Sequence, residues 1–194
     1  VMHYIPHRMS DGYGLQVSGI DRLHEEGAKV VISVDCGIRS LDAASRAREL
    51  GIDLIVTDHH EPAEVLPRAY AVIYPRRIDS DYPNPNLSGA GVAFKIAQGI
   101  CIRAAHIDWV SALLKIAAIG TLADVVPLRG ENRVIASLGL EALTAGIHTK
   151  GLQALLEVSG LAGRRIDSDD VSFRLAPRIN AAGRMSSAEE AAKL

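Results

Sequence analysis

Short apolar runs alternate with amphipathic stretches over the first 75 residues of the chain. The apolar runs are rich in Val, Ile and Tyr, which is typical of buried strands. Strands are predicted at residues 1–6, 29–35, 53–58 and 69–75. Residues 15–28 and 40–50 carry apolar positions at helical spacing and predict helices. Strands that alternate with helices favour βαβ units and a parallel sheet.

The pattern changes after residue 75. Residues 75–91 are rich in turn residues and predict a loop. Long Ala-rich stretches then predict helices at residues 91–105, 108–126, 131–146 and 150–160. Residues 168–185 contain Pro177 and Gly183, which argues against a single helix there. We therefore predict an α/β fold: a parallel β-sheet flanked by helices over residues 1–86, followed by a mainly helical part of the same domain over residues 87–194.

Composition narrows the class of protein. Hydrophobic residues make up 48% of the 194 residues and aromatic residues only 4%, which suits a parallel sheet buried on both faces. The formal net charge of −2 excludes a whole-molecule positive field, so a nucleic-acid site would need a local basic patch or bound metal ions. Cys36 and Cys101 lie in apolar contexts and predict small core residues in a reducing cytoplasm. No apolar stretch approaches the roughly 20 residues that span a bilayer.

Polar side chains follow two neighbouring strands of the predicted sheet. Asp35 comes directly after one strand, and Asp58, His59 and His60 follow the next. Ligands of open parallel sheets bind outside the carboxyl ends of the strands, so these side chains are expected to converge. Carboxylates with imidazoles suit Mn²⁺, and also Zn²⁺ or Mg²⁺. The alternative is an aspartate that caps the next helix and two histidines on the surface.

Asp124 ends an otherwise apolar helix. A carboxylate at a helix C-terminus is unfavourable for the helix dipole, which prefers cations there. Either this helix end is simply solvated, or a metal ion supplies the missing positive charge. The residues alone leave both interpretations open.

The stretch "FRLAPRINAAGRM" combines Arg174, Arg178 and Arg184 with Asn180 and Gly183. We predict a tight loop flanked by these arginines. Guanidinium groups bind phosphate oxygens bidentately, so the loop is a candidate phosphate receptor. The alternative is a basic surface loop with ordinary ion pairs.

The stretch "NLSGAGVAFK" places Gly89 and Gly91 at the start of a predicted helix. Glycines allow close approach of backbone amides to an anion at a helix N-terminus. A lone Gly-x-Gly is a weak signal, and a plain turn with a helix cap explains it equally well.

Taken together, these stretches resemble the DHH phosphoesterase superfamily, and within it the RecJ single-stranded-DNA exonucleases. The segments "VISVDCGI", "VTDHH", "ADVVPL" and "APRINAAGRM" carry the resemblance in this order, and "HRMSDGYGL" and "NPNLSGAGVAFK" add to it. The similarity runs from about Met2 to Leu194. It implies a metal-dependent hydrolase that cleaves single-stranded DNA from 5′ to 3′ and releases mononucleotides, in DNA repair and recombination.

The resemblance also implies roles for individual residues. Asp35, His59 and Asp124 would bind the metal ions of a two-metal site for Mn²⁺ or Mg²⁺. Asp58 would belong to the same centre, and His60 would lie against the scissile phosphate. The implied contacts to the DNA backbone or its phosphates are Arg8, Gly89, Gly91, Arg178, Asn180 and Arg184.

Two parts of the family pattern have no counterpart here. These are an Asp-x-Asp stretch before residue 1 and a later small domain, so the chain resembles the middle of a longer protein. We expect its metal site to be incomplete and its activity alone to be reduced. A single-strand-binding protein or a helicase is an implied partner. Two alternatives stay open: a phosphoesterase acting on pyrophosphate, cyclic dinucleotides or short oligonucleotides, and a non-catalytic DNA-binding scaffold.

Overall fold

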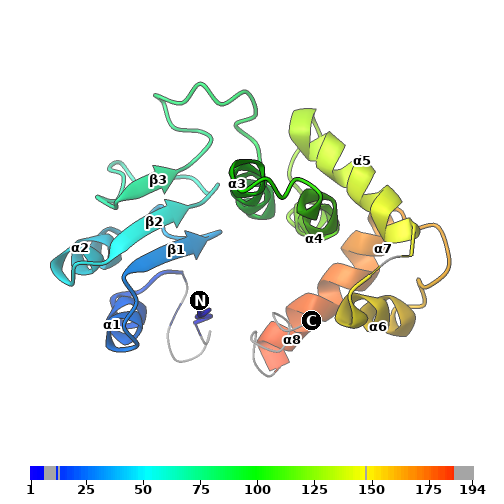
Figure 1. The fold of residues 1–194 in the computed structure, drawn as a ribbon, viewed down its shortest axis with the longest axis horizontal. Coiled ribbons are helices and arrows are strands. Elements are labelled where there is room, and N and C mark those ends of the chain that lie inside the picture. Colours follow the sequence, from blue (N-terminus) through cyan, green and yellow to red (C-terminus); the bar gives the residue numbers. More distant parts are fainter. Residues whose placement is uncertain (7–11, 13, 147, 186–194) are drawn as a thin grey trace. The chain divides into compact units, whose positions relative to one another are not determined.

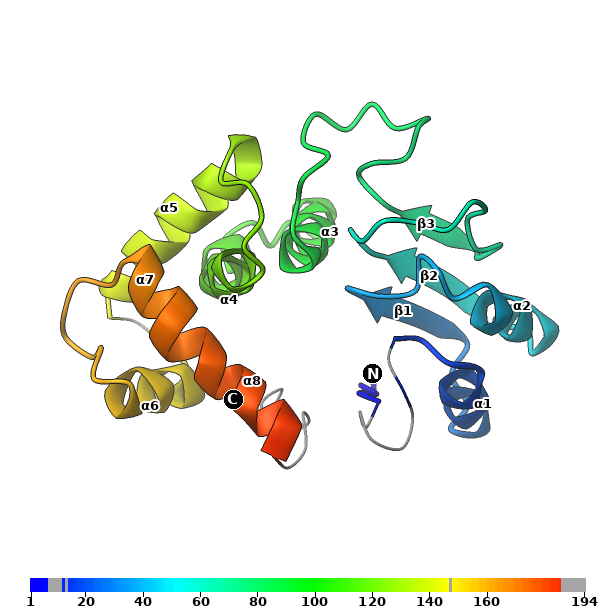
Figure 2. The ribbon, with the colours of Figure 1, turned by 180° about the vertical axis from the view of Figure 1, so that it is seen from behind.

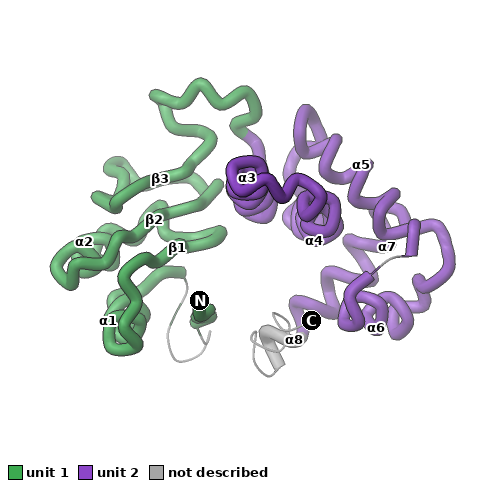
Figure 3. Tube along the Cα trace, viewed as in Figure 1, with its two compact units in different colours: residues 1–85 green, residues 86–194 purple. Residues whose placement is uncertain are grey.

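The computed structural model describes residues 1–6, 12, 14–146 and 148–185. The chain forms two compact units, Val1–Pro85 and Asn86–Leu194 (Figure 3). No helix within the described ranges provides an apolar run that is long enough to cross a membrane. The first unit is α/β and the second is helical, which confirms the predicted fold class.

The first unit is built on a parallel sheet of three strands in the order β1-β2-β3 (Figure 1). The strands are β1 (Val30–Val34), β2 (Asp53–Thr57) and β3 (Ala71–Ile73). Helix α1 (Val17–Glu25) precedes β1, and α2 (Leu41–Glu49) connects β1 to β2. All of these elements lie within the predicted ranges.

Both helices of this unit pack on one face of the sheet. Their Ile, Leu and Ala side chains form a core with the inward-facing residues of β1 and β2. The buried core residues are Leu15, Ile20, Leu23, Val31, Ala43, Ala44, Ala47, Ile52, Leu54 and Val56. On the other face, Val30, Ile32 and Val34 are each more than half exposed. The prediction of a sheet buried on both faces is therefore wrong for β1 in this unit, because both helices cover the same side.

The strand predicted at residues 1–6 is also wrong. None of these residues joins the sheet, although their apolar pattern resembles that of β1. Instead, Tyr4 packs against α1: its ring lies under the Arg22 guanidinium, with Arg22 Cζ 5.3 Å from the ring centroid. It also lies so close to Gly19 that a Cβ there would be 2.9 Å from the ring. Residues 1–6 are therefore held by packing of Tyr4 on α1 and not by pairing with a strand.

The second unit begins with four helices that match the predicted positions. They are α3 (Gly89–Arg103), α4 (Trp109–Ala123), α5 (Gly130–Thr144) and α6 (Lys150–Val158). Small residues let the first three pack closely. A Cβ at Gly120 would lie 2.4 Å from Ala90, and one at Gly139 would lie 2.1 Å from Ala118. The Ala- and Gly-rich composition of these helices therefore serves close helix–helix contact.

The tight loop predicted within residues 168–185 is wrong. Helix α7 (Ser168–Asp170), the π-helix η1 (Val171–Leu175) and α8 (Ala176–Met185) follow one another without a break (Figure 2). Proline disrupts helices because it lacks an amide hydrogen. Pro177 is the second residue of α8, next to the point where the backbone hydrogen bonds change register, so the missing amide costs little there. Arg178 Nη1 also donates to the Arg174 carbonyl oxygen at 2.7 Å, across the same turn.

Asp170 anchors the start of this helical run. Its buried carboxylate accepts hydrogen bonds from Arg164 Nη2 at 2.7 and 3.0 Å and from Arg174 Nη1 at 3.3 Å. Asp167 and Asp170 form a capping box. Burial opposes ionisation of Asp170, but the Asp167 amide and the two arginines outweigh it and hold the pKa of Asp170 below its usual value.

We expect this lowered pKa to make the second unit sensitive to acid. The stabilisation is complete above the unfolded-state pKa of about 3.9 and is lost as the pH falls through the lower folded-state value. Asp170→Asn should cost about 2 kcal/mol near pH 7 and show a shallower loss below pH ~4. Urea unfolding of the two proteins across this pH range tests it, with the exposed neighbour Asp169→Asn as control. The same acid dependence in Asp170→Asn and the unsubstituted chain would contradict this account.

Candidate metal centre

The carboxyl ends of β1 and β2 carry the candidate ligands. Val34 pairs with Thr57 at the end of the β1–β2 ladder, so Asp35 and Asp58 are the next residues of adjacent strands. Asp58 is held further by its amide, which donates to the Ile73 carbonyl of β3 at 3.2 Å. The sheet therefore brings both sets of polar residues to one edge, as the sequence predicts.

A sharp turn after β1 presents the Asp35 side chain. Asp35 has φ +60°, in the left-handed region that aspartate tolerates better than most residues. Its amide donates to the Thr57 carbonyl at 3.0 Å. Gly37 has φ +106°, and a Cβ there would lie 2.9 Å from Ser33 Oγ. Unusual backbone held in place at such a turn is frequent at functional sites.

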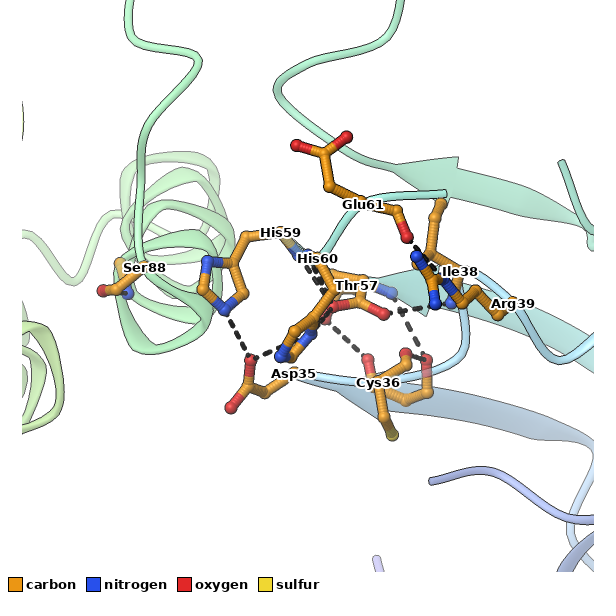
Figure 4. Close-up of polar contacts among 12 residues, drawn as sticks. Asp35, Cys36, Ile38, Arg39, Thr57, His59, His60, Glu61 and Ser88 are labelled. Carbon is orange, nitrogen blue, oxygen red and sulfur yellow. Dashed lines mark hydrogen bonds and ion pairs between the residues drawn. The ribbon is translucent and has the colours of Figure 1, made fainter. Parts of the chain in front are cut away.

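Asp35, His59 and His60 form a cluster of possible metal ligands (Figure 4). One donor atom from each lies within 4.8 Å of the others. His59 Nε2 is 3.2 Å from Asp35 Oδ1. Neighbouring ligands of a six-coordinate ion with bonds of about 2.1 Å lie roughly 3 Å apart, so this spacing fits two donors of one ion. The His59 side chain is 12% exposed while those of Asp35 and His60 are 53% exposed, which leaves the cluster open on one side.

The Asp58 carboxylate is engaged within the protein. Its side chain is 2% exposed. Oδ2 accepts from the Ile38 amide at 3.0 Å, and Oδ1 accepts from the amides of His59 and His60 at 2.8 and 3.2 Å. His60 Nδ1 lies 2.7 Å from the same Oδ1. Asp58 therefore ties the loop after β1 to the two histidines and fixes the orientation of the His60 ring.

The charge states of two groups follow from these contacts. Burial disfavours ionisation of Asp58, but its hydrogen bonds from Ile38, His60 and His59 outweigh burial and lower its pKa. Burial, with the nearby carboxylates of Asp58 and Asp35, raises the pKa of the Cys36 thiol to about 11. Cys36 is thus protonated near neutral pH and is a poor nucleophile or metal ligand.

Asp124 lies in the second unit, directly after α4. Its amide donates to the Gly120 carbonyl at 3.0 Å and closes the helix. The next residue, Val125, is 86% exposed and has φ +55°, which is unfavourable for a β-branched side chain. A metal-binding role for Asp124 stays a prediction, and the unusual backbone beside it is a reason to test it.

The predicted phosphate-binding residues fall on helices or outside the described residues. Arg178 and Asn180 are on α8, the helix that also contains Arg184. Gly89 is the first residue of α3, and the Gly91 amide donates to the N-cap Ser88 Oγ at 2.9 Å. That bond favours the plain helix cap for Gly91. Arg8 lies outside the described residues.

Comparison with known proteins assigns the chain to a family. The model of the "DHH family, N-terminal domain" matches residues 1–121, a range that includes the whole cluster. The chain belongs to the DHH family. The resemblance in the sequence motifs is thereby confirmed.

Several relatives of this DHH chain are RecJ proteins. It is 42% identical over 191 residues to the single-stranded-DNA-specific exonuclease RecJ of Bacillus subtilis, covering 98% of this chain and 24% of that protein. It is 39% identical over 193 residues to the Escherichia coli protein of the same name, covering 94% and 33%. The chain thus spans between 24% and 33% of the length of these two relatives.

Solved structures agree with this relationship. A crystal structure of exonuclease RecJ bound to manganese matches with a TM-score of 0.80 and 36% identity, covering 97% of this chain and 46% of the other. The Thermus thermophilus RecJ in complex with Mn²⁺ matches with a TM-score of 0.78 and 34% identity, covering 92% and 26%. Both structures contain Mn²⁺, an ion that the donor set of the cluster also suits.

Proposed function

We propose that this DHH chain carries the metal centre of a hydrolase that cleaves phosphodiester bonds of single-stranded DNA. The cluster of Asp35, His59 and His60 at the carboxyl edge of the sheet carries the proposal. Its oxygen and nitrogen donors suit Mn²⁺ or Mg²⁺. The names of the RecJ relatives support a single-stranded DNA substrate.

The proposed ligands in this chain are Asp35 and His59, with Asp124 as a further ligand of a two-metal site. A bound divalent ion would act as a Lewis acid toward the phosphate and lower the pKa of a coordinated water. The negative charge of Asp35 would favour cation binding, and His59, largely buried, would hold its imidazole in a fixed orientation.

His60 is the proposed contact to the scissile phosphate. Nδ1 of this ring is paired with the Asp58 carboxylate, so Nε2 is the nitrogen that remains for the substrate. When both ring nitrogens are protonated, the Nε2 hydrogen can donate to a phosphoryl oxygen. Such a preorganised donor stabilises charge that develops on phosphate in the transition state.

The finer features of the proposal come from the resemblance to RecJ. They are 5′→3′ direction, release of mononucleotides, a role in DNA repair and recombination, and a cytoplasmic location. A single-strand-binding protein or a helicase is a proposed partner. The proposed contacts to DNA phosphates are Arg8, Gly89, Gly91, Arg178, Asn180 and Arg184.

The decisive experiment follows nucleotide release from single-stranded DNA labelled at its 5′ end, with and without Mn²⁺. We expect Mn²⁺-dependent release of labelled mononucleotide that disappears in Asp35→Ala and His59→Ala. Asp42→Ala removes an exposed aspartate of the same unit and should retain activity. Release that persists in Asp35→Ala would overturn the proposal. Faster hydrolysis of dinucleotides or pyrophosphate than of longer DNA would favour a small-molecule phosphoesterase.

A further inference from the structure

Arg39 lies in the loop between β1 and α2, four residues after Asp35. It lines a pocket of about 360 Å³ whose other lining residues include Asp35, Asp58, His60 and Glu61. Three of these residues, Asp35, Asp58 and Glu61, carry carboxylate groups. Arg39 therefore places a cationic side chain in the same pocket as Asp35 and His60 of the candidate metal cluster.

The Arg39 guanidinium is fixed by a hydrogen bond to the next strand's loop. Its Nε donates to the backbone carbonyl of Glu61 at 2.7 Å, and Glu61 directly follows His60 (Figure 4). The side chain is thus tied to the loop that carries both histidines. Because the anchor uses only Nε, it leaves the two terminal amino groups, Nη1 and Nη2, for another partner.

Several other arginines of this unit are neutralised by carboxylates. Arg46 pairs with Asp21 and Glu49, Arg76 with Glu61, and Arg77 with Asp79. Within the described part of the first unit, Arg39 has no carboxylate at salt-bridge distance. Its positive charge is consequently not neutralised by a direct partner, and its guanidinium is already positioned.

We propose that Arg39 binds a phosphate of the DNA backbone next to the phosphate held at the metal centre. A guanidinium with both terminal amino groups available fits two phosphate oxygens at once. The surrounding carboxylates of Asp35, Asp58 and Glu61 would otherwise repel a polyanion. Arg39 would offset this repulsion and align the strand with His60. This inference rests on the proposed function and adds a substrate-binding residue to it.

A purely structural role for Arg39 makes a different prediction. If Arg39 only stabilises the loop after β2 through its hydrogen bond to the Glu61 carbonyl, its replacement lowers thermal stability but leaves the salt dependence of DNA binding unchanged. A phosphate contact instead contributes to counterion release, and each such contact adds about 0.7 to the slope of log K against log salt for single strands. The salt slope therefore separates the two roles.

The test measures binding of fluorescent oligo(dT) by anisotropy, without divalent ions, over a range of salt concentrations. We expect Arg39→Gln to weaken binding about fivefold or more at low salt and to reduce the slope by about 0.7. Arg39→Lys should keep the slope, because it keeps the charge. Arg48→Gln removes an equal charge from an exposed site on α2 and should change affinity less than about twofold. An unchanged slope in Arg39→Gln would overturn the proposal.

A second measurement compares positions along the strand within each protein, so a uniform loss of stability in a variant does not change its result. Oligonucleotides carrying one neutral methylphosphonate are scanned along the strand. We expect one position at which the neutral linkage weakens binding to the unsubstituted protein and to Arg39→Lys, but not to Arg39→Gln. The absence of any such position would refute the contact. If Mn²⁺-dependent release fails while the Arg39 effects appear, the proposed hydrolase fails and the phosphate contact stands.

Discussion

Replacing Asp35 with alanine is expected to weaken Mn²⁺ binding by about 100-fold or more. Loss of groups that only orient metal ligands already costs roughly 10- to 100-fold in affinity, and Asp35 is proposed as a direct ligand. The substitution removes a donor atom 3.2 Å from His59 Nε2 together with a negative charge. The Asp35 side chain is 53% exposed, so truncation leaves no large cavity. Isothermal titration calorimetry with Mn²⁺ measures the change directly.

The control for this prediction is Asp42→Ala, which removes an exposed carboxylate from α2 in the same unit. It should leave Mn²⁺ affinity within about twofold of the unsubstituted chain, because exposed charges at a distance are screened by salt. His59→Ala should reproduce the loss seen in Asp35→Ala. Equal affinities in Asp35→Ala and Asp42→Ala would show that the ion binds elsewhere.

The positions of Asp35, His59 and His60 could be predicted from the sequence because of the strand periodicity. Apolar β-branched runs end at residues 34 and 57, and the carboxyl ends of adjacent parallel strands share one edge. The pairing of Val34 with Thr57 then brings the ligands together. Local patterns were sufficient here because the sheet itself provides the long-range geometry.

The hydrogen bonds of Asp58 could not be predicted in this way. Its partner Ile38 lies 20 residues earlier, and its amide reaches Asp58 only because Asp35 and Gly37 turn the chain back. The position of the Arg39 guanidinium could not be predicted from the sequence for the same reason. The sequence shows only that Arg39 lies in the loop after Asp35. The orientation of its guanidinium depends on the contact with the Glu61 carbonyl, which lies in a different loop.

The two errors in secondary structure also have physical causes. Apolar residues 1–6 resemble a strand, yet strand formation requires a partner, and Tyr4 packs on α1 instead. Pro177 and Gly183 suggested a loop, yet the π-helix before Pro177 accommodates the missing amide. Local propensity was outweighed by packing in the first case and by a change of hydrogen-bond register in the second.

Asp58→Asn is expected to reduce the rate of DNA hydrolysis by more than about 100-fold while Mn²⁺ affinity falls less than about tenfold. The Asp58 carboxylate accepts three backbone amides and lies against His60 Nδ1, so all of its contacts use it as an acceptor. An asparagine replaces one acceptor oxygen with an NH₂ donor. This NH₂ group must face at least one of the N–H donors that now point at the carboxylate. In catalytic His–Asp pairs of other enzymes, the same exchange costs about 10⁴-fold, because the imidazole adopts the wrong tautomer. Single-turnover hydrolysis and calorimetry separate the two effects.

If Asp58 had only a structural role, Asp58→Asn would not lower the hydrolysis rate much more than the Mn²⁺ affinity. Leaving a buried donor unsatisfied costs about 1–3 kcal/mol, so Asp58→Asn is expected to be less stable but folded under native conditions. The ¹⁵N shifts of the His60 imidazole report which ring nitrogen carries the proton, and they should change in Asp58→Asn. Asp53→Asn, at the exposed opposite end of β2, should change neither the shifts nor the rate. If Asp58→Asn lost Mn²⁺ affinity as completely as Asp35→Ala, Asp58 would be a ligand, and the orientation of His60 would need another source.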